Sequence, residues 1–153
     1  MTAYNGPGRI KQMPLGNGMS VTLEYDAQNR RVKQKDYTTG PLITTEYVYT
    51  GSQVIEEYKD TVLSKTFVYA DYIDDPIVMT TGSDRYYYVK DRQYTIKAVT
   101  DDAGVILESY EYSAYGVMTI FDNQHNDITA TGSAIDNPYG YTGRRWDSYT
   151  GLW

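Results

Sequence analysis

The chain has 153 residues, of which 18 are tyrosine and none is cysteine. Its formal net charge of −6 argues against nucleic acid as a partner, because duplexes are bound through clusters of Lys and Arg. The lack of cysteine excludes disulfides and thiolate zinc sites. The first residues have no apolar stretch, so we expect no signal peptide. No run approaches the ~20 apolar residues of a membrane helix, so we expect no membrane insertion.

Residues 1–17 are rich in Gly, Pro and Asn and predict an irregular lead-in with at most one short strand at 9–12. Val21, Leu23 and Tyr25 then alternate with polar residues, which predicts a strand with one buried face. Further strands are predicted at 31–37, 42–50, 53–59, 62–69, 77–81, 85–89, 95–100, 105–112 and 117–121. Residues 18–121 are therefore predicted to form hairpins, and residues 122–153 an irregular C-terminal part.

These patterns predict an all-β fold with little or no helix, because no window of a dozen residues has helical spacing. Roughly ten strands joined by short turns are typical of a meander of consecutive antiparallel β-hairpins, which we expect to form a curved strip. Tyrosine favours half-buried strands, where the ring packs and the hydroxyl stays hydrated. The tyrosines are therefore predicted to be packing residues rather than ligands.

Short polar segments between the strands predict specific turns. Asp26 can accept hydrogen bonds from the amides that follow it, and Asn29 tolerates the left-handed conformation that closes a hairpin. Asp101 and Gly104 bracket a similar turn, and Gly116 marks another. The residues expected to pack across strands are Tyr25, Tyr69, Tyr88, Tyr112 and Tyr115.

An ordered set of motifs resembles a known family. Residues 25–30 resemble the tyrosine-aspartate (YD) repeat, and residues 67–77 are similar to a family segment that ends in Asp-Glu-Pro-Leu. Residues 86–116 resemble the Rhs repeat-associated core, of whose His-x-Asp-x-Leu-Gly-Ser motif only Asp91 is kept. Residues 137–153, including Gly143 and Arg144, are similar to the Asn-Pro, Thr-Gly-Arg and Thr-Gly-Leu ending of that core. The resemblance covers about residues 18–153.

The resemblance implies a role in the wall of a protein shell. In Rhs proteins, Tc-toxin C-type proteins and teneurins, such hairpins form a strip that spirals into a hollow shell around a toxin or an empty space. It implies an effector or toxin as cargo, and a secreted or cell-surface parent protein. The family core continues beyond the Gly-Leu-Trp motif into an Asp-Pro-rich motif that resembles an aspartyl autoprotease. We therefore expect a C-terminally truncated core.

Candidate catalytic groups are sparse. The acidic pairs are Glu56–Glu57, Asp74–Asp75 and Asp101–Asp102, and neighbouring residues on a strand point to opposite faces. His125 is the sole histidine and lies in a polar stretch. Oxygen ligands for calcium occur at Asp122, Asn123, Asn126 and Asp127, but their spacing does not match an EF-hand. We expect no catalytic residue, no cofactor and no metal.

Three functional hypotheses follow. The preferred one is a non-enzymatic wall segment of a cargo-enclosing shell. The second is an extracellular adhesion or carbohydrate-binding module in which exposed tyrosines and Trp146 stack on sugars, and the third is a hydrolase that uses an acidic pair. A strip that does not close has open edges, so self-association is expected through an edge strand or through Gly151, Leu152 and Trp153.

Overall fold

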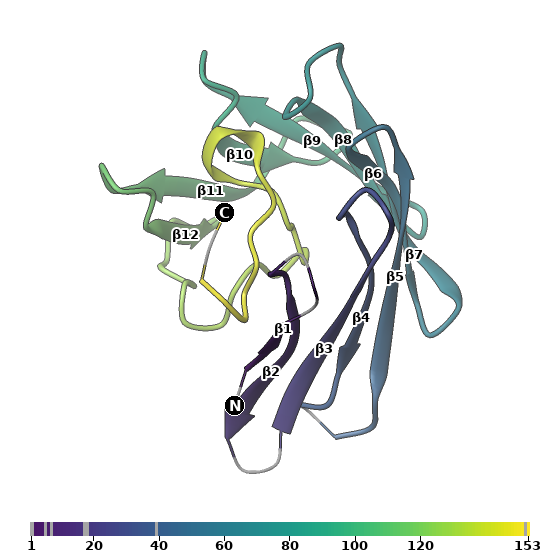
Figure 1. Ribbon diagram of the computed structural model, residues 1–153. Helices are drawn as coiled ribbons and strands as arrows, with labels where there is room; N and C mark the ends of the chain where they lie inside the picture. The colour runs from purple at the N-terminus through teal and green to yellow at the C-terminus, as the bar shows by residue number, and fades with distance from the viewer. Residues whose placement is uncertain (1, 5, 7, 17–18, 39, 152) are drawn as a thin grey trace. The chain divides into compact units, whose positions relative to one another are not determined.

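The computed structural model in Figure 1 describes residues 2–4, 6, 8–16, 19–38, 40–151 and 153. These described residues form twelve strands that pair in one sheet, in the order in which they occur along the chain. These strands are β1 (Ala3–Tyr4), β2 (Ile10–Gly16), β3 (Met19–Tyr25), β4 (Arg31–Asp36), β5 (Ile43–Thr50), β6 (Gln53–Lys59), β7 (Val62–Tyr69), β8 (Pro76–Thr81), β9 (Asp84–Lys90), β10 (Ile96–Thr100), β11 (Ile106–Tyr112) and β12 (Met118–Asp122).

The prediction of an all-β antiparallel meander is confirmed. Regular helix among the described residues is limited to one 3-10 turn, η1 (Tyr141–Gly143). The predicted strands 53–59 and 62–69 coincide with β6 and β7. The sequence pattern succeeds here because consecutive strands are joined by short turns, so each strand pairs with its neighbour in the sequence.

The N-terminal segment is more regular than predicted. Residues 1–17 were expected to be an irregular lead-in, whereas β1 and β2 occupy part of this segment and β2 pairs with β3. The register places Gln12 opposite Thr22 and Met13 opposite Val21. Main-chain pairing to β3 does not require apolar alternation in β2, so the sequence pattern underestimates this strand.

The chain divides into two compact units, which we call the N-terminal unit (residues 1–66) and the C-terminal unit (residues 67–153). This division differs from the predicted boundaries at 17/18 and 121/122. The C-terminal part does not stand apart from the hairpins, because it packs on strands of its own unit. For example, the amide of Ile96 donates to the carbonyl of Gly140 at 3.0 Å.

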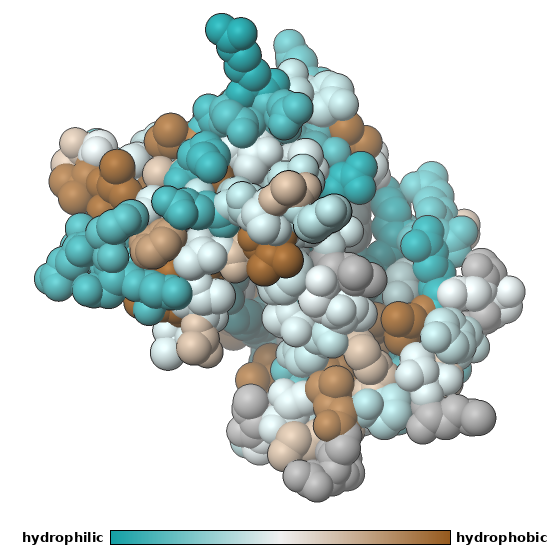
Figure 2. Space-filling model, turned by 90° about the vertical axis from the view of Figure 1, so that its left-hand side faces the viewer, coloured by the Kyte–Doolittle hydropathy of each residue, from teal (hydrophilic) through white to brown (hydrophobic). Residues whose placement is uncertain are grey.

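Buried side chains are distributed unevenly along the chain. In the N-terminal unit they include Val21, Leu23, Val54, Thr45, Glu57 and Lys65. In the C-terminal unit they include Phe67, Met79, Tyr88, Ile96, Val99, Tyr110, Ile120 and Tyr139. Figure 2 shows one face of the molecule, on which apolar side chains lie in small separate groups among hydrophilic ones.

Candidate functional site

One turn geometry occurs five times in the part of the chain that the structure describes, and we call it the capped turn. It occupies residues 26–30, 91–95, 101–105, 113–117 and 122–126. In each, the amide of the first residue donates to the carbonyl of the fifth, and the amide of the fourth donates to the carbonyl of the first. The side-chain oxygen of the first residue accepts from the amides of the third and fifth residues.

The fourth residue of every capped turn is left-handed. Its φ is 62° at Asn29, 62° at Tyr94, 78° at Gly104, 79° at Gly116 and 64° at His125. This conformation costs little for Gly and Asn and more for residues with a larger side chain. The carboxylate or hydroxyl at the first position offsets that cost by satisfying two amides that the turn leaves without ladder partners.

The structure therefore places the predicted turn residues Asp26, Asn29, Asp91, Asp101, Gly104 and Gly116 in equivalent turns. The first position is Asp in four turns and Ser113 in the fifth. Hydrogen bonds from the Arg30 amide, the Arg30 side chain and the Gln28 amide hold the pKa of Asp26 below its ordinary value. Hydrogen bonds from Asn126 lower the pKa of Asp122 in the same way.

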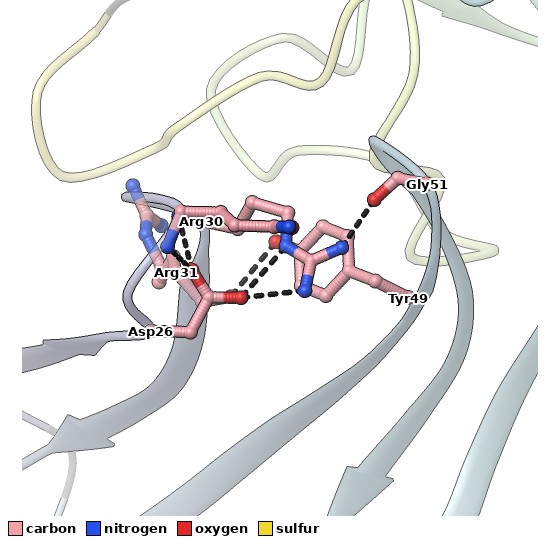
Figure 3. Close-up of polar contacts among 6 residues, drawn as sticks. Asp26, Arg30, Arg31, Tyr49 and Gly51 are labelled. Atoms are coloured by element: carbon pink, nitrogen blue, oxygen red, sulfur yellow. Dashed lines mark hydrogen bonds and ion pairs between the residues drawn. The ribbon is translucent and has the colours of Figure 1, made fainter.

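Arg30 extends the first capped turn to the next hairpin (Figure 3). Its Nε donates to Asp26 Oδ2 at 2.7 Å, and its Nη1 donates to the carbonyl of Gly51 in the β5–β6 turn. The guanidinium lies over the ring of Tyr49, with 4.8 Å between Cζ and the ring centroid. One arginine thus connects two turns that are separated by 21 residues in the sequence.

Three tyrosine hydroxyls make one recurring contact, which we call the tyrosine latch. The hydroxyl of Tyr25 donates to the carbonyl of Ile10 at 2.9 Å, that of Tyr49 to Arg31 at 2.8 Å, and that of Tyr112 to Ile96 at 3.0 Å. Each tyrosine stands at the end of a strand or one residue before it, and each acceptor is the first residue of the preceding strand. A latch of this kind resists slippage of the strand register.

In the C-terminal unit, two other strand tyrosines bond instead to residues 133–151 and 153, which we call the C-terminal segment. The hydroxyl of Tyr88 donates to Asn137 Oδ1 at 3.0 Å, and the hydroxyls of Tyr69 and Tyr139 bond to each other. The ring of Tyr139 meets Phe67, Tyr69 and Tyr88 edge-on, with centroid distances of 5.2, 6.1 and 6.1 Å. Burial raises the pKa of Tyr88 far above its ordinary value.

A buried carboxylate holds the C-terminal segment against β11. Glu108 is 1% exposed, and it accepts hydrogen bonds from the hydroxyl of Tyr110 and from Ser133 Oγ at 2.7 Å. The amides of Ala134 and Ile135 donate to its other oxygen at 2.5 and 3.3 Å. Burial of the ring and the adjacent carboxylate raise the pKa of Tyr110. These bonds offset the cost of burying a charge.

Close backbone approach fixes the end of the segment. A Cβ atom on Gly143, where φ is 70°, would overlap the carbonyl oxygen of Asp74. A Cβ atom on Gly140 would overlap the ring of Trp153, whose Nε1 donates to the carbonyl of Gly116 at 2.9 Å. Arg144 is more distant, with 3.8 Å between its Nε and Asp74 Oδ2. Arg145 lies over the ring of Tyr139, with 5.7 Å between Cζ and the ring centroid.

The packing role predicted for Tyr115 is wrong. Its side chain is 96% exposed, because it is the third residue of the capped turn 113–117 and lies outside the sheet. Tyr25, Tyr69, Tyr88 and Tyr112 do bond across strands or to the C-terminal segment. Trp146, proposed to stack on sugars, lies 4.8 Å from the ring of Trp153. Leu152 lies outside the described residues.

The acidic pairs are engaged in structural contacts. Asp101 caps a turn, and Asp102 accepts from the hydroxyl of Tyr87 at 2.8 Å. Asp75 pairs with Lys90, and Glu56 accepts from the hydroxyl of Tyr58 at 2.9 Å. Glu57 lies opposite Lys65 in the β6–β7 register, and both side chains are buried.

The histidine and the acidic groups are not arranged as metal ligands in the described residues. His125 stacks on Phe121 at 4.5 Å within the last capped turn. In the described part of the chain, no three His, Asp or Glu side chains lie close enough to hold a metal ion. The described residues also contain no helix that is long and apolar enough to cross a membrane.

Comparison with known proteins points to one class of fold. The chain is 27% identical over 136 residues to the tRNA3(Ser)-specific nuclease WapA of Bacillus spizizenii, and 27% identical to the tRNA nuclease WapA of Bacillus subtilis. Each match covers 87% of this chain but only 5% of the relative. No family model matches the chain.

Solved structures match almost the whole chain. The TcdB2–TccC3 complex superposes with a TM-score of 0.64 and 15% identity over 95% of this chain. The Tc holotoxin pore of Photorhabdus luminescens superposes with a TM-score of 0.62 over 96% of this chain. Each match covers 8% of the larger chain, so this chain has the fold of a short stretch of a Tc-toxin subunit.

Sequence reasoning missed Glu108 and Asn137. Asn137 Nδ2 donates to the hydroxyl of Tyr110 at 3.0 Å and to the carbonyl of Tyr139 at 2.8 Å, and its Oδ1 accepts from Tyr88. The available signal for Glu108 was its position between Leu107 and Tyr110, on the same strand face as Tyr110 and Tyr112. A charged residue on an otherwise apolar face indicates a buried charge with dedicated partners.

Proposed function

We propose that this chain is a non-enzymatic wall segment of a YD-repeat or Rhs-type shell that encloses a C-terminal toxin or other cargo in its parent protein. The observation that carries this proposal is the repetition of capped turns and tyrosine latches along a sheet whose strands follow chain order. A unit that repeats by short-range contacts can be extended indefinitely, which suits a long wall.

The relatives support the proposal. WapA is named as a tRNA nuclease, and TccC3 occurs in the Tc holotoxin pore, so both kinds of relative are large toxin-type proteins. This chain spans about 5% of the curated relatives, which favours a repeated structural part over a complete effector. We propose a secreted or cell-surface location for the parent on the same grounds.

The structural engagement of the acidic pairs supports a non-enzymatic role. Carboxylates that cap turns or pair with lysine are not poised as general acid and base, which need a substrate within hydrogen-bond reach. We expect the isolated chain to leave tRNA intact during prolonged incubation. Cleavage that survives further purification would show that the wall carries an activity of its own.

A cysteine-labelling experiment tests the wall role, since the sequence contains no cysteine. Lys59 shares a sheet face with Thr45, whereas Val48 lies on the opposite face of the same hairpin. In the isolated chain, Lys59→Cys and Val48→Cys should both react with a bulky maleimide. In the parent protein one of the two should be protected, because one face of a shell wall lies inside. Equal labelling in the parent would contradict enclosure and favour an adhesion module.

We also propose that self-association, if it occurs, does not use β12. The amide of Ile128 donates to the carbonyl of Ile120 at 2.8 Å, and the amide of Ile120 donates to Thr129 Oγ1 at 2.9 Å. These bonds occupy main-chain groups at the outer edge of β12, which blunts that edge. The opposite end of the sheet, at β1 and β2, is therefore the edge expected to pair with another copy. Light scattering over a range of concentrations measures the molar mass of the chain in solution. A variant that disrupts the β2 edge should lower any concentration-dependent rise in that mass.

A further inference from the structure

Tyr72 and Tyr94 form a parallel aromatic pair near the open end of the β8–β9 hairpin. Their ring centroids are 4.6 Å apart, and the angle between the ring planes is 16°. The tyrosines around Tyr139 meet differently, since Tyr69 and Tyr88 each lie almost perpendicular to Tyr139. The Tyr72 and Tyr94 rings therefore face each other in contact, whereas the perpendicular rings meet edge to face.

Both rings are carried by anchored backbone. Tyr94 is the left-handed residue of a capped turn, with φ of 62°, a conformation that is rare for a bulky side chain. Its turn is fixed by Asp91, which accepts from the amides of Gln93 and Thr95. The segment that carries Tyr72 is closed by a hydrogen bond from the amide of Ala70 to the carbonyl of Asp75 at 3.0 Å. The pair is therefore held together before any reaction.

Access also distinguishes this pair from the buried tyrosines. Tyr72 is 50% exposed, whereas Tyr88 and Tyr110 are 7% and 2% exposed. Burial raises the pKa of both buried phenols, which opposes the loss of their protons. Tyr115 is 96% exposed but makes no ring contact within the described part of the chain. Tyr72 combines solvent access with a half-buried tyrosine partner, Tyr94, at stacking distance.

We propose that Tyr72 and Tyr94 are an oxidative cross-linking site that forms dityrosine. A one-electron oxidant, such as a peroxidase supplied with hydrogen peroxide, takes one electron and one proton from each phenol. The two phenoxyl radicals couple through a new carbon–carbon bond between the ring carbons adjacent to the oxygens. Each coupled carbon then loses its hydrogen as the ring regains aromaticity, and each oxygen regains a proton. Overall two electrons and two protons leave the protein, and one peroxide becomes two waters.

The cross-link would join the two ends of the β8–β9 hairpin covalently. Lys90 already holds these ends together through its ion pair with Asp75 and a hydrogen bond to the carbonyl of Pro76 at 2.9 Å. A covalent closure would restrict the unfolded chain as a disulfide does, in a protein that has no cysteine. This inference is independent of the proposed function.

The test treats the purified full chain, at low concentration, with peroxidase and hydrogen peroxide. Digestion and mass spectrometry should identify a peptide pair joined through Tyr72 and Tyr94 that has lost two hydrogen atoms. The yield of this intramolecular product should not depend on protein concentration. Tyr72→Phe and Tyr94→Phe keep the rings but remove the oxidisable phenol, and each should abolish the product. Tyr115→Phe is the matched control and should leave the yield unchanged.

Two results would overturn the proposal. One is a set of products spread over many tyrosines without enrichment of the 72–94 pair. The other is a product that forms only between chains and rises with concentration. Circular dichroism of the three phenylalanine variants checks that each keeps the fold. Because Tyr72→Phe and Tyr94→Phe test the pair independently, the test still holds if one of them does not fold.

Discussion

The two units of this chain have the same strands and turns but are stabilised in different ways. The N-terminal unit has eight basic and seven acidic residues, and the C-terminal unit has six basic and thirteen acidic ones. In the N-terminal unit, charged side chains pair across neighbouring strands, as Lys33 does with Glu46 at 2.6 Å. In the C-terminal unit, the C-terminal segment covers buried tyrosines and a buried carboxylate. A meander can thus be stabilised strand by strand or by a covering segment.

The tyrosine hydroxyls show this difference most directly. Tyr25 and Tyr49 bond within consecutive hairpins, to the first residue of the preceding strand. Tyr69 and Tyr88 occupy strands of the C-terminal unit and bond to residues 139 and 137 of the C-terminal segment. Tyrosine hydroxyls therefore bond either to the preceding strand or to the C-terminal segment. Which of the two occurs depends on whether the C-terminal segment lies within reach.

Loss of the buried carboxylate should have the largest effect. Glu108→Ala leaves the hydroxyls of Tyr110 and Ser133 and two amides without their acceptor. We expect a loss of about 4 kcal/mol in the free energy of unfolding, since each buried donor left unpaired costs ~1–3 kcal/mol. Urea unfolding measures this change.

The matched control for Glu108 is Glu111→Ala, on the opposite face of the same strand. An exposed substitution of this kind should change the free energy of unfolding by less than about 0.5 kcal/mol. Equal effects of the two variants would show that the carboxylate does not hold the covering segment. Hydrogen exchange on the full chain should place the loss at Glu108 in residues 133–151.

A glycine pair separates close packing from backbone strain. Gly143→Ala combines a left-handed backbone with overlap on Asp74, so we expect a cost of about 3 kcal/mol. Gly104→Ala has the same left-handed strain, but no atom lies within 4 Å of its Cβ position, so it should cost about 1 kcal/mol. Thermal unfolding of both variants measures the difference. If the two variants lose the same free energy of unfolding, η1 moves away from Asp74 at no measurable cost.

The tyrosine latches predict equal effects in the two units. Tyr49→Phe and Tyr112→Phe each remove one hydrogen bond to a main-chain carbonyl and keep the ring. Each should lower the free energy of unfolding by about 1 kcal/mol. Tyr112→Ala should cost more, about 3 kcal/mol or above, because it also leaves a cavity. If neither phenylalanine variant changes the free energy of unfolding, the tyrosine latches do not stabilise the fold.

Acid should open the capped turns selectively. In the folded chain the pKa values of Asp26 and Asp122 lie below their ordinary value of 3.8. Their contribution is fully present above about pH 4 and is lost as the pH falls through the folded pKa. Amide resonances of Gln28 and Asn126 should shift in that range. Ser113 caps an equivalent turn with a hydroxyl, so the amide of Val117 should not follow. A parallel shift at Val117 would indicate general unfolding.

Salt should have the smallest effect, and in the N-terminal unit it should act on the charge pairs between neighbouring strands. The pairs Lys33–Glu46 and Lys35–Glu24 are partly exposed, so added salt screens them. We expect slightly faster hydrogen exchange in β4 and β5 at high salt and no change around Glu108. A larger effect around Glu108 would contradict the contrast between the two units.

The sequence by itself determined the fold class, most strand positions and the turn chemistry. Alternation with period two reports which face of a strand is buried, and Asp and Gly at turns act on backbone within five residues of themselves. Local rules of this kind can be found in one sequence, as at Asp26 and Asn29. The same rules placed Tyr115 wrongly, because they do not report whether a turn residue meets the sheet.

Only the tertiary structure decided which groups meet across the sequence. Glu108 bonds to residues 133–135, and Tyr88 to Asn137, at separations of 25 to 49 residues. The spacing of residues in the sequence does not predict these pairings, because they depend on where the C-terminal segment packs on the sheet. The partition into two units has the same origin. Strand pairing is local in a meander, whereas the burial of its charges and tyrosines depends on contacts that are distant in the sequence.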